Sequence, residues 1–266
     1  MKKFGFIGAG KMAGAIVGGL ISSGAAKPGE IACVCGNDDT GKNLAKSAGI
    51  SLSDSAAQLF EDAETVVLAC KPQQMAEAAK SVGGAKCETL ISILAGTPIR
   101  RLRECFPGAE KIVRVMPNMP AQISQGISCF AAESPLSPRE REAVESVLGA
   151  IGEFMEIPES GLDAVTALSG SGPGYVFEFA AAMIEGAQKL GFSKGEAEKL
   201  VKKTLLGSAM LLAQSPLSAD ELRSAVSSPG GTTLAALDVF EKSGLRKTVS
   251  DALEAARKRS RELSQL

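Results

Sequence analysis

A glycine pattern near the N-terminus limits the possible folds of this chain more strongly than any other segment. The apolar run Phe4–Ile7 is followed directly by Gly8-Ala9-Gly10-Lys11-Met12-Ala13, a G-x-G-x-x-A arrangement. Between a strand and a helix, the first glycine of such a pattern permits a tight turn, and the second lets the backbone approach a pyrophosphate. The small third residue lets the helix pack closely on the strand. We therefore predict a strand over residues 4–7, a helix over residues 12–23 and a dinucleotide-binding turn between them.

The rest of the first half alternates short apolar runs with amphipathic stretches. This rhythm is typical of βαβ units and of strands that are buried on both faces of a parallel sheet. It predicts a Rossmann-type α/β domain over residues 1–160, built on a doubly wound parallel sheet. After the first strand, the expected strands are Ile31–Val34, Thr65–Ala69, Thr89–Leu94, Lys111–Met116 and Ile127–Ala131, with a helix at Thr40–Ala48.

The second half changes to long helical periodicity after Pro135 and Pro138. Because Ile157-Pro158 closes a last extended piece, the domain boundary is expected near residue 160, with an all-α C-terminal dimerisation domain over residues 161–266. Small residues in segments 179–191 and 207–213 permit close helix packing, either against a second subunit or within the chain. The expected helices are Pro138–Ile151, Gly161–Leu168, Gly174–Leu190, Lys194–Ala213, Ala219–Ala225, Thr232–Lys242 and Leu245–Ser264.

Composition narrows the range of partners. The 29 basic and 30 acidic side chains give a net charge of −1, which offers neither a nucleic acid nor an anionic membrane an electrostatic surface. No stretch reaches the roughly 20 apolar residues of a membrane span. The six cysteines lack metal-binding or disulfide spacing, which favours reduced thiols, a cytoplasmic location and no metal site. Small molecules and further copies of the chain are the expected partners.

Two segments at the ends of predicted strands bear on the cofactor. An acidic residue after the second strand favours NAD, whereas a basic one favours NADP; Asp38 and Asp39 indicate the first and Lys42 the second. The preference therefore stays open. Ala69-Cys70-Lys71-Pro72 follows the third strand, where ligands bind in open α/β sheets. Lys71 either lines the cofactor site or is merely solvated there.

The residue inventory also bears on the chemistry. The chain contains no histidine, which removes the usual acid and base for interconverting alcohols and ketones by hydride transfer. A Tyr-Lys pair on one helix is absent as well, because Phe179 stands one turn after Tyr175, the only tyrosine. Reduction of an already protonated C=N bond needs only a hydride, so the composition favours imine reduction.

Two glycine-rich segments interrupt the helical half. Ser169-Gly170-Ser171-Gly172-Pro173-Gly174 is expected to be a loop that separates two helices. Ser227-Ser228-Pro229-Gly230-Gly231-Thr232-Thr233 runs directly into a predicted helix, whose free amides and dipole would suit a carboxylate ligand. A simple helix cap followed by a turn explains the second segment equally well.

Taken together, these segments resemble the pyrroline-5-carboxylate reductase family over nearly the whole chain and in the same order. The glycine pattern is joined by Ala69-Cys70-Lys71-Pro72-Gln73, Met116-Pro117-Asn118-Met119-Pro120-Ala121, Ser169-Gly170-Ser171-Gly172-Pro173 and Val226-Ser227-Ser228-Pro229-Gly230-Gly231-Thr232-Thr233. The last motif is highly specific for that family.

The resemblance implies a reaction and a set of roles. Hydride would pass from NADPH, with NADH also possible, to the C=N bond of 1-pyrroline-5-carboxylate, which gives L-proline in the last step of proline biosynthesis. Thr233 and Lys71 would be the catalytic residues, and the family implies an intertwined homodimer, often assembled further into a pentamer of dimers. The residues implied for the cofactor are Gly8, Ala9, Gly10, Lys11 and Met12 at the pyrophosphate, Asn37 at the adenine ribose, and Ala69, Cys70, Lys71, Pro72, Ala95 and Gly96 at the ribose and nicotinamide. The residues implied for the substrate are Asn118, Gly230, Gly231, Thr232 and Thr233.

The chain departs from the family pattern at several positions. Met119 stands where threonine is usual, and Gly174 replaces a common alanine. The segment Ser215–Ser218 lacks the acidic residue that many members carry, and Ser55-Ala56 lacks an asparagine often found near the adenosine. Two other functions therefore remain as alternatives: a reductase of a related cyclic imine, and a non-catalytic regulatory protein that binds the cofactor.

Overall fold

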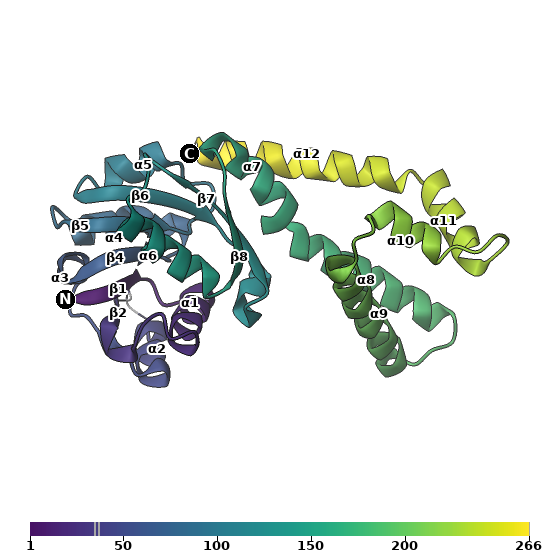
Figure 1. The fold of residues 1–266 in the computed structure, drawn as a ribbon, viewed down its shortest axis with the longest axis horizontal. Helices are drawn as coiled ribbons and strands as arrows, with labels where there is room; N and C mark the ends of the chain where they lie inside the picture. Colours follow the sequence, from purple (N-terminus) through teal and green to yellow (C-terminus); the bar gives the residue numbers. More distant parts are fainter. Residues whose placement is uncertain (35, 37, 266) are drawn as a thin grey trace. The chain divides into compact units, whose positions relative to one another are not determined.

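The structure is a computed structural model that describes residues 1–34, 36 and 38–265, and it divides into two compact units (Figure 1). The first unit contains residues 1–171 and 256–266, and the second contains residues 172–255. The chain thus leaves the first unit after Ser171 rather than near residue 160. Leu162 and Ala167 explain the difference, since both are buried in the first unit and hold the segment after residue 160 against it.

The first unit is built on an eight-stranded sheet with the order β3-β2-β1-β4-β5-β6-β7-β8. Strands β1 to β6 run parallel, but β7 is antiparallel to β6, so the sheet is not parallel throughout. The β6–β7 connection holds only a 3-10 turn, η3 (Met119–Ile123), which is too short for a parallel crossover. The strands are β1 (Lys2–Ile7), β2 (Ile31–Val34), β3 (Ser51–Leu52), β4 (Ala63–Leu68), β5 (Cys87–Ser92), β6 (Ala109–Met116), β7 (Gly126–Ala132) and β8 (Gly152–Glu156).

Helices cover both faces of this sheet and enclose two apolar cores. One core joins Phe4 and Phe6 of β1 to α1 and α6, and the other includes Phe60 and Phe106, whose rings stack at 6.1 Å. Helices α1, α2 and α6 agree with the sequence pattern, whereas α3, α4 and α5 were not predicted from it. The helices are α1 (Lys11–Ser22), α2 (Thr40–Ala48), α3 (Ala56–Asp62), α4 (Met75–Val82), α5 (Ile99–Cys105), α6 (Pro138–Gly149) and α7 (Leu162–Val165).

The expected loop at residues 169–174 is instead helical. A π-helical turn, η5 (Thr166–Gly170), continues α7, and α8 (Gly172–Lys189) begins two residues later. The Ser171 N–H donates to the Thr166 carbonyl at 2.8 Å, which is the five-residue spacing of a π-helix. A Cβ on Gly170 would meet the Cε of Met116 of β6, so the flexible end of the Met116 side chain would have to shift to admit it. Close packing, rather than chain reversal, therefore accounts for the glycine at this position.

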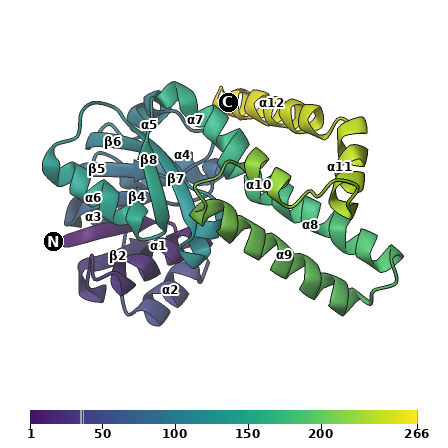
Figure 2. The same cartoon turned by 45° about the vertical axis from the view of Figure 1, so that its right-hand side comes forward.

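The second unit consists of α8, α9 (Lys194–Gln214), α10 (Ala219–Ala225), α11 (Thr232–Lys242) and the first half of α12 (Leu245–Ser264). Helices α8 and α9 lie side by side as a hairpin (Figure 2). A capping box between Ser193 and Glu196 starts α9. Across residues 172–255, all of which are described, only Ala197 and Val201 are buried hydrophobic residues.

None of the helices in the described part of the chain is long and apolar enough to cross a membrane. Four of the described cysteines are free thiols: Cys70, Cys87, Cys105 and Cys129.

Candidate functional site

A cleft lies at the carboxyl edge of the sheet, where the strand order reverses between β1 and β4. Such a reversal leaves a crevice in which open α/β sheets bind their ligands. Backbone hydrogen bonds join the turns around it: the Gly8 N–H donates to the Val34 carbonyl at 3.0 Å, and the Ala69 N–H donates to the Ile7 carbonyl at 2.8 Å. The glycine turn and the segment after β4 are thereby held on either side of the crevice.

The cleft has a volume of about 480 Å³. Six of the predicted cofactor residues line it: Gly8, Ala9, Gly10, Ala69, Cys70 and Lys71. Lys11, Met12, Pro72, Ala95 and Gly96 are not part of this lining. Asn37 lies outside the described residues, so its predicted contact with the ribose stays a prediction.

The two motif glycines have different geometries. Gly8 has φ +97°, and a Cβ there would lie 2.7 Å from the Cys70 nitrogen and 2.8 Å from the Ala69 oxygen. Gly10 has ordinary backbone angles, and a Cβ there would meet nothing within 4 Å. Gly8 is therefore required by the fold, whereas Gly10 keeps space open beside the backbone.

The N-terminus of α1 fits a dinucleotide pyrophosphate. No side chain caps Gly10, and the first turn of α1 carries no acidic residue. The amides of that turn and the helix dipole therefore face the open space at Gly10, which suits an anion. The residues present thus match the chemistry of the group that the glycine pattern predicts.

The part of the cleft that follows β2 is acidic. Asp38 lines it, and the Asp38 Oδ1 accepts hydrogen bonds from the Thr40 hydroxyl at 2.5 Å and the Thr40 amide at 3.1 Å. These bonds, with the positive charge of Lys71, lower the pKa of the Asp38 carboxyl, so it is ionised at neutral pH. Lys42 instead pairs with Asp39 at 3.2 Å and does not line the cleft.

Several residues that line the cleft were missed by the sequence analysis. They come from the β3–α3 turn and from the segment that contains α4, neither of which was anticipated. The Ser55 hydroxyl accepts from the Gln58 amide at 3.1 Å, so the Ser-x-x-Gln spacing was a usable signal for a helix start. The missed residues include Asp54, Gln74, Glu77 and Ser81, whereas Ser55 lies at the position already noted near the adenosine.

Two neighbouring side chains after β4 differ in character. Burial raises the pKa of the Cys70 thiol to about 11, so it is protonated and unreactive near neutral pH. Lys71 is exposed, and its backbone N–H donates to Gln74 Oε1 at 3.1 Å. Lys71 therefore places an exposed cation in the lining of the cleft.

The segment Ala95-Gly96-Thr97 follows β5, the next strand along the same edge. The Ile93 N–H donates to the Leu68 carbonyl at 3.2 Å, which holds the start of this segment to the end of β4. Gly96 has φ +66°, a conformation that favours glycine. The segment therefore has a defined conformation two strands away from the glycine turn, with β4 between them.

Asn118 has a structural partner. Its Oδ1 accepts from the Ile127 N–H at 3.0 Å, and Asn118 also precedes η3 as its N-cap. The side chain therefore fixes the start of β7, and its amide NH₂ group is the part that could contact a substrate.

The predicted carboxylate loop lies in the second unit. Gly230 has φ +70°, and the Gly231 N–H donates to the Ser228 carbonyl at 2.9 Å, so the chain turns sharply into α11. No side chain caps Gly231, and the first turn of α11 carries no acidic residue. Thr232 is exposed and Thr233 is half-buried. This helix start therefore has the free amides and hydroxyls that a carboxylate ligand requires.

The fold and the cleft define a Rossmann-type dinucleotide-binding protein with an added helical unit. A family model described as pyrroline-5-carboxylate reductase dimerisation matches residues 159–263, and one described as NADP oxidoreductase coenzyme F420-dependent matches residues 3–96. The pyrroline-5-carboxylate reductase of Pseudomonas aeruginosa is 39% identical to this chain, over 99% of this chain and 97% of the relative. That of Arabidopsis thaliana is 34% identical, over 99% of this chain and 96% of the relative. The chain belongs to the pyrroline-5-carboxylate reductase family.

Solved structures agree with this assignment. A pyrroline-5-carboxylate reductase from Coxiella burnetii has a TM-score of 0.89 at 33% identity, and the Plasmodium falciparum pyrroline carboxylate reductase with NADP bound has a TM-score of 0.86 at 28% identity. The alignments cover 99% of this chain and 98% of each structure. A reductive aminase from Aspergillus terreus shares the fold, with a TM-score of 0.59 at 15% identity over 100% of this chain and 94% of its own.

Among the residues that the structure describes, no group of three or more His, Cys, Asp or Glu side chains is placed to hold a metal ion.

Proposed function

We propose that this protein reduces 1-pyrroline-5-carboxylate to L-proline with NADPH, the last step of proline biosynthesis, and that NADH can replace NADPH. The observation that carries the proposal is the pairing, in one chain, of the glycine-lined cleft with the uncapped Gly231 start of α11. The first suits a dinucleotide and the second a carboxylate. Full-length similarity to reductases of this name supports the same substrate.

The composition of the chain fits this chemistry. The bound dinucleotide would supply a hydride to the carbon of the C=N bond, and the ring nitrogen would already carry its proton. No side chain is then needed as a general acid, which agrees with the absence of histidine. Thr233 would hydrogen-bond the ring nitrogen and orient the C=N bond. Lys71, which lines the cleft, would be the second catalytic residue.

The binding roles follow from position. Gly8, Ala9 and Gly10, with Lys11 and Met12 of the first turn of α1, would hold the pyrophosphate. The amides at Gly230, Gly231 and Thr232 of the second unit would bind the substrate carboxylate. Asn118 of the first unit is also assigned to substrate binding, through its NH₂ group. The remaining cofactor contacts are assigned as follows: Asn37 to the adenine ribose, and Ala69, Cys70, Lys71, Pro72, Ala95 and Gly96 to the ribose and nicotinamide.

We propose that the protein is cytoplasmic and forms a homodimer that assembles further into a pentamer of dimers. The second unit leaves large apolar side chains in contact with solvent, among them Phe177 at 58%, Leu206 at 53% and Met210 at 52% exposure. Burial against another copy of the chain would remove this surface from water. The matching dimerisation model supports self-association, and the free thiols suit a reducing compartment.

The direct test is an absorbance assay that follows oxidation of NADPH and NADH in parallel, with racemic pyrroline-5-carboxylate as substrate. Rapid loss of the reduced cofactor that depends on substrate would support the reaction and rank the two cofactors. Turnover only of a cyclic imine with another ring size would favour the related reductase. Cofactor binding without turnover of any imine would favour a non-catalytic regulatory role.

Thr233→Ala tests the assignment of the hydroxyl. Loss of a hydrogen bond to a charged group costs about 1.5–3 kcal/mol, so kcat/KM for pyrroline-5-carboxylate should fall roughly 10- to 100-fold. The dissociation constant for NADPH should not change. Thr248→Ala, which removes another helix hydroxyl that bonds a backbone carbonyl, is the control. Unchanged kinetic constants in Thr233→Ala would show that the hydroxyl has no role in the reaction.

A further inference from the structure

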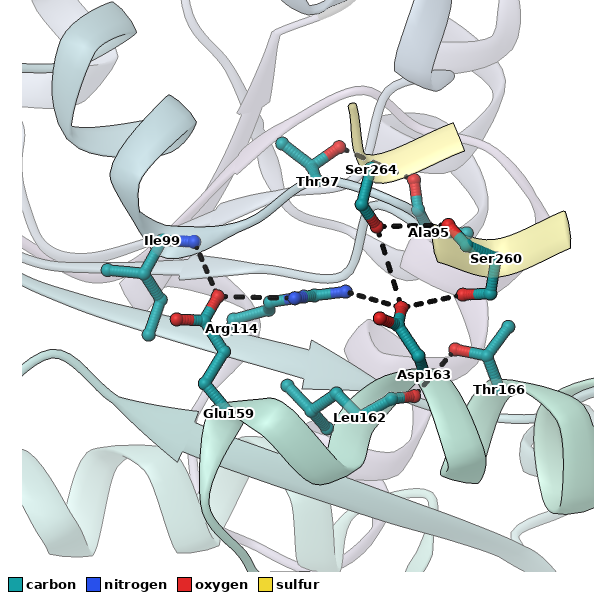
Figure 3. Close-up of polar contacts among 10 residues, drawn as sticks. All are labelled: Ala95, Thr97, Ile99, Arg114, Glu159, Leu162, Asp163, Thr166, Ser260 and Ser264. Atoms are coloured by element: carbon teal, nitrogen blue, oxygen red, sulfur yellow. Dashed lines mark hydrogen bonds and ion pairs between the residues drawn. The ribbon is translucent and has the colours of Figure 1, made fainter. Parts of the chain in front are cut away.

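A buried ionic network lies in the first unit, beside the segment that follows β5 (Figure 3). Arg114 of β6 has a side chain only 7% exposed, and its guanidinium contacts Glu159 Oε1 at 3.1 Å and Asp163 Oδ1 at 3.8 Å. A charge buried to this extent is stable only when it is paired. Arg114 therefore holds both carboxylates in fixed positions.

Each carboxylate in turn holds a second element. Glu159 Oε1 accepts from the Ile99 N–H at 2.7 Å, in the first turn of α5. Asp163 Oδ1 accepts from the buried Ser260 hydroxyl at 2.7 Å, near the end of α12. Residue 260 follows residue 163 by 97 positions, so the network fastens the end of the chain to the sheet. The start of α5 and the end of α12 are thus tied to one guanidinium.

The segment Ala95–Thr97 lies between these two attachments. It leads directly into α5, and a Cβ on Gly96 would lie 3.1 Å from the Leu263 Cβ of α12. Thr97 is buried, and its hydroxyl donates to the Ala95 carbonyl at 3.4 Å. The end of α12 therefore packs against the backbone of this segment. Glu159 holds the start of α5, the helix that follows the segment.

We infer that Arg114, Glu159, Asp163 and Ser260 are positioning residues that hold Ala95–Thr97 against the nicotinamide half of the cofactor. This rests on the proposed function, which places Ala95 and Gly96 beside the nicotinamide. The last turns of α12 then support the site where hydride leaves. The adenine half binds at the Asp38 end of the cleft, which no residue of the network lines. The network should therefore affect one half of the cofactor and spare the other.

The test compares two ligands in the full-length protein. Ser260→Ala removes one donor from a buried contact, and Asp163→Asn removes the charge but keeps an oxygen acceptor. Both should weaken NADPH binding about three- to tenfold, as loss of one hydrogen bond predicts, and leave the affinity for adenosine 2′,5′-bisphosphate unchanged. Hydrogen exchange of residues 93–99 should be faster in both variants. Ser47→Ala, which removes an exposed helix hydroxyl on α2, should alter neither quantity.

The outcomes separate the possible roles. Equal weakening of both ligands would show general destabilisation, and unchanged NADPH binding with unchanged exchange would show no role; either result overturns the inference. In kinetics, the KM for NADPH should rise while the KM for pyrroline-5-carboxylate stays constant. If the wild-type protein turned over no pyrroline-5-carboxylate, the proposed function would fail. The two-ligand comparison and the exchange measurement would still decide the positioning role.

Discussion

At the residue scale, the two glycines of the first turn perform different tasks. Gly8 adopts a positive φ and lies against the backbone of Ala69 and Cys70, so it is needed before any ligand binds. Gly10 has free space where a side chain would lie, so a ligand can approach its backbone. The same residue type therefore serves folding at one position and ligand binding two residues later.

Gly10→Val should abolish NADPH binding while the protein stays folded, because the new side chain would fill the space for the pyrophosphate without meeting protein atoms. Calorimetric titration with NADPH and a thermal melt measure the two effects. Gly18→Val on the same helix, where a Cβ also meets nothing within 4 Å, is the matched control and should bind NADPH normally. Normal binding by Gly10→Val would contradict the placement of the pyrophosphate.

Asp38→Asn should favour NADPH over NADH. The carboxylate is ionised at neutral pH and would repel the 2′-phosphate, so its removal should tighten NADPH binding by about 1 kcal/mol, roughly fivefold, at low salt. NADH binding should change little, and high salt should reduce the effect on NADPH. Asp62→Asn, at the opposite end of α3 from the cleft residue Ser55, makes the same change in net charge and should leave the ratio unaltered. An unchanged ratio in Asp38→Asn would place the 2′-phosphate away from this carboxylate.

At the element scale, close packing of helices explains glycines that turns do not explain. Gly19, in the last turns of α1, faces the backbone of Ala150 so closely that a Cβ would collide with its carbonyl oxygen. Gly170, within the π-helical turn, lies against the end of the flexible Met116 side chain, which could shift, whereas the backbone of Ala150 could not move as easily. In both cases the glycine lies inside a helical element, where it permits contact instead of ending the helix.

Gly19→Ala should lower the free energy of unfolding by about 1–3 kcal/mol, because the backbone of Ala150 must move to admit the methyl group. The adjacent Gly18→Ala has open space and should raise it by about 0.5–1 kcal/mol through helix propensity. Urea denaturation of the two variants measures both values. A stabilising Gly19→Ala would mean that α1 and α6 pack less closely than described.

At the scale of the whole molecule, the two units differ in how they are stabilised. The first unit has two apolar cores, one on each face of its sheet. The second unit buries two hydrophobic residues of its own and exposes many others. Such a unit gains little from packing within one chain, so association between copies should contribute strongly to its stability.

Leu206→Glu combined with Met210→Glu should convert the assembly to monomers and abolish turnover. Both residues are about half exposed and lie one turn apart on α9, so two charges there would oppose burial against another copy. Light scattering after size exclusion measures the mass, and titration with adenosine 2′,5′-bisphosphate should show that the cleft still binds. Lys203→Glu on the same helix is the control. An unchanged mass would place the contact between copies on another face.

Local sequence patterns determined much of this protein. The glycine turn, the run of apolar strands and the helical periodicity depend on neighbouring residues, so the order of elements, the cofactor class and most helices of the second unit followed from them. The family motifs likewise located Gly231 at the start of α11 as expected. These features need no knowledge of distant contacts.

Only the tertiary structure decided what depends on residues far apart in the chain. The antiparallel β7, the helical Ser169–Gly174 segment and the return of α12 to the first unit each depend on packing against another element. The acidic lining from Asp54 and Glu77 and the bond between Asp163 and Ser260 are of the same kind. Side-chain spacing along a chain records helix and strand periods, but it does not record which distant surfaces will meet.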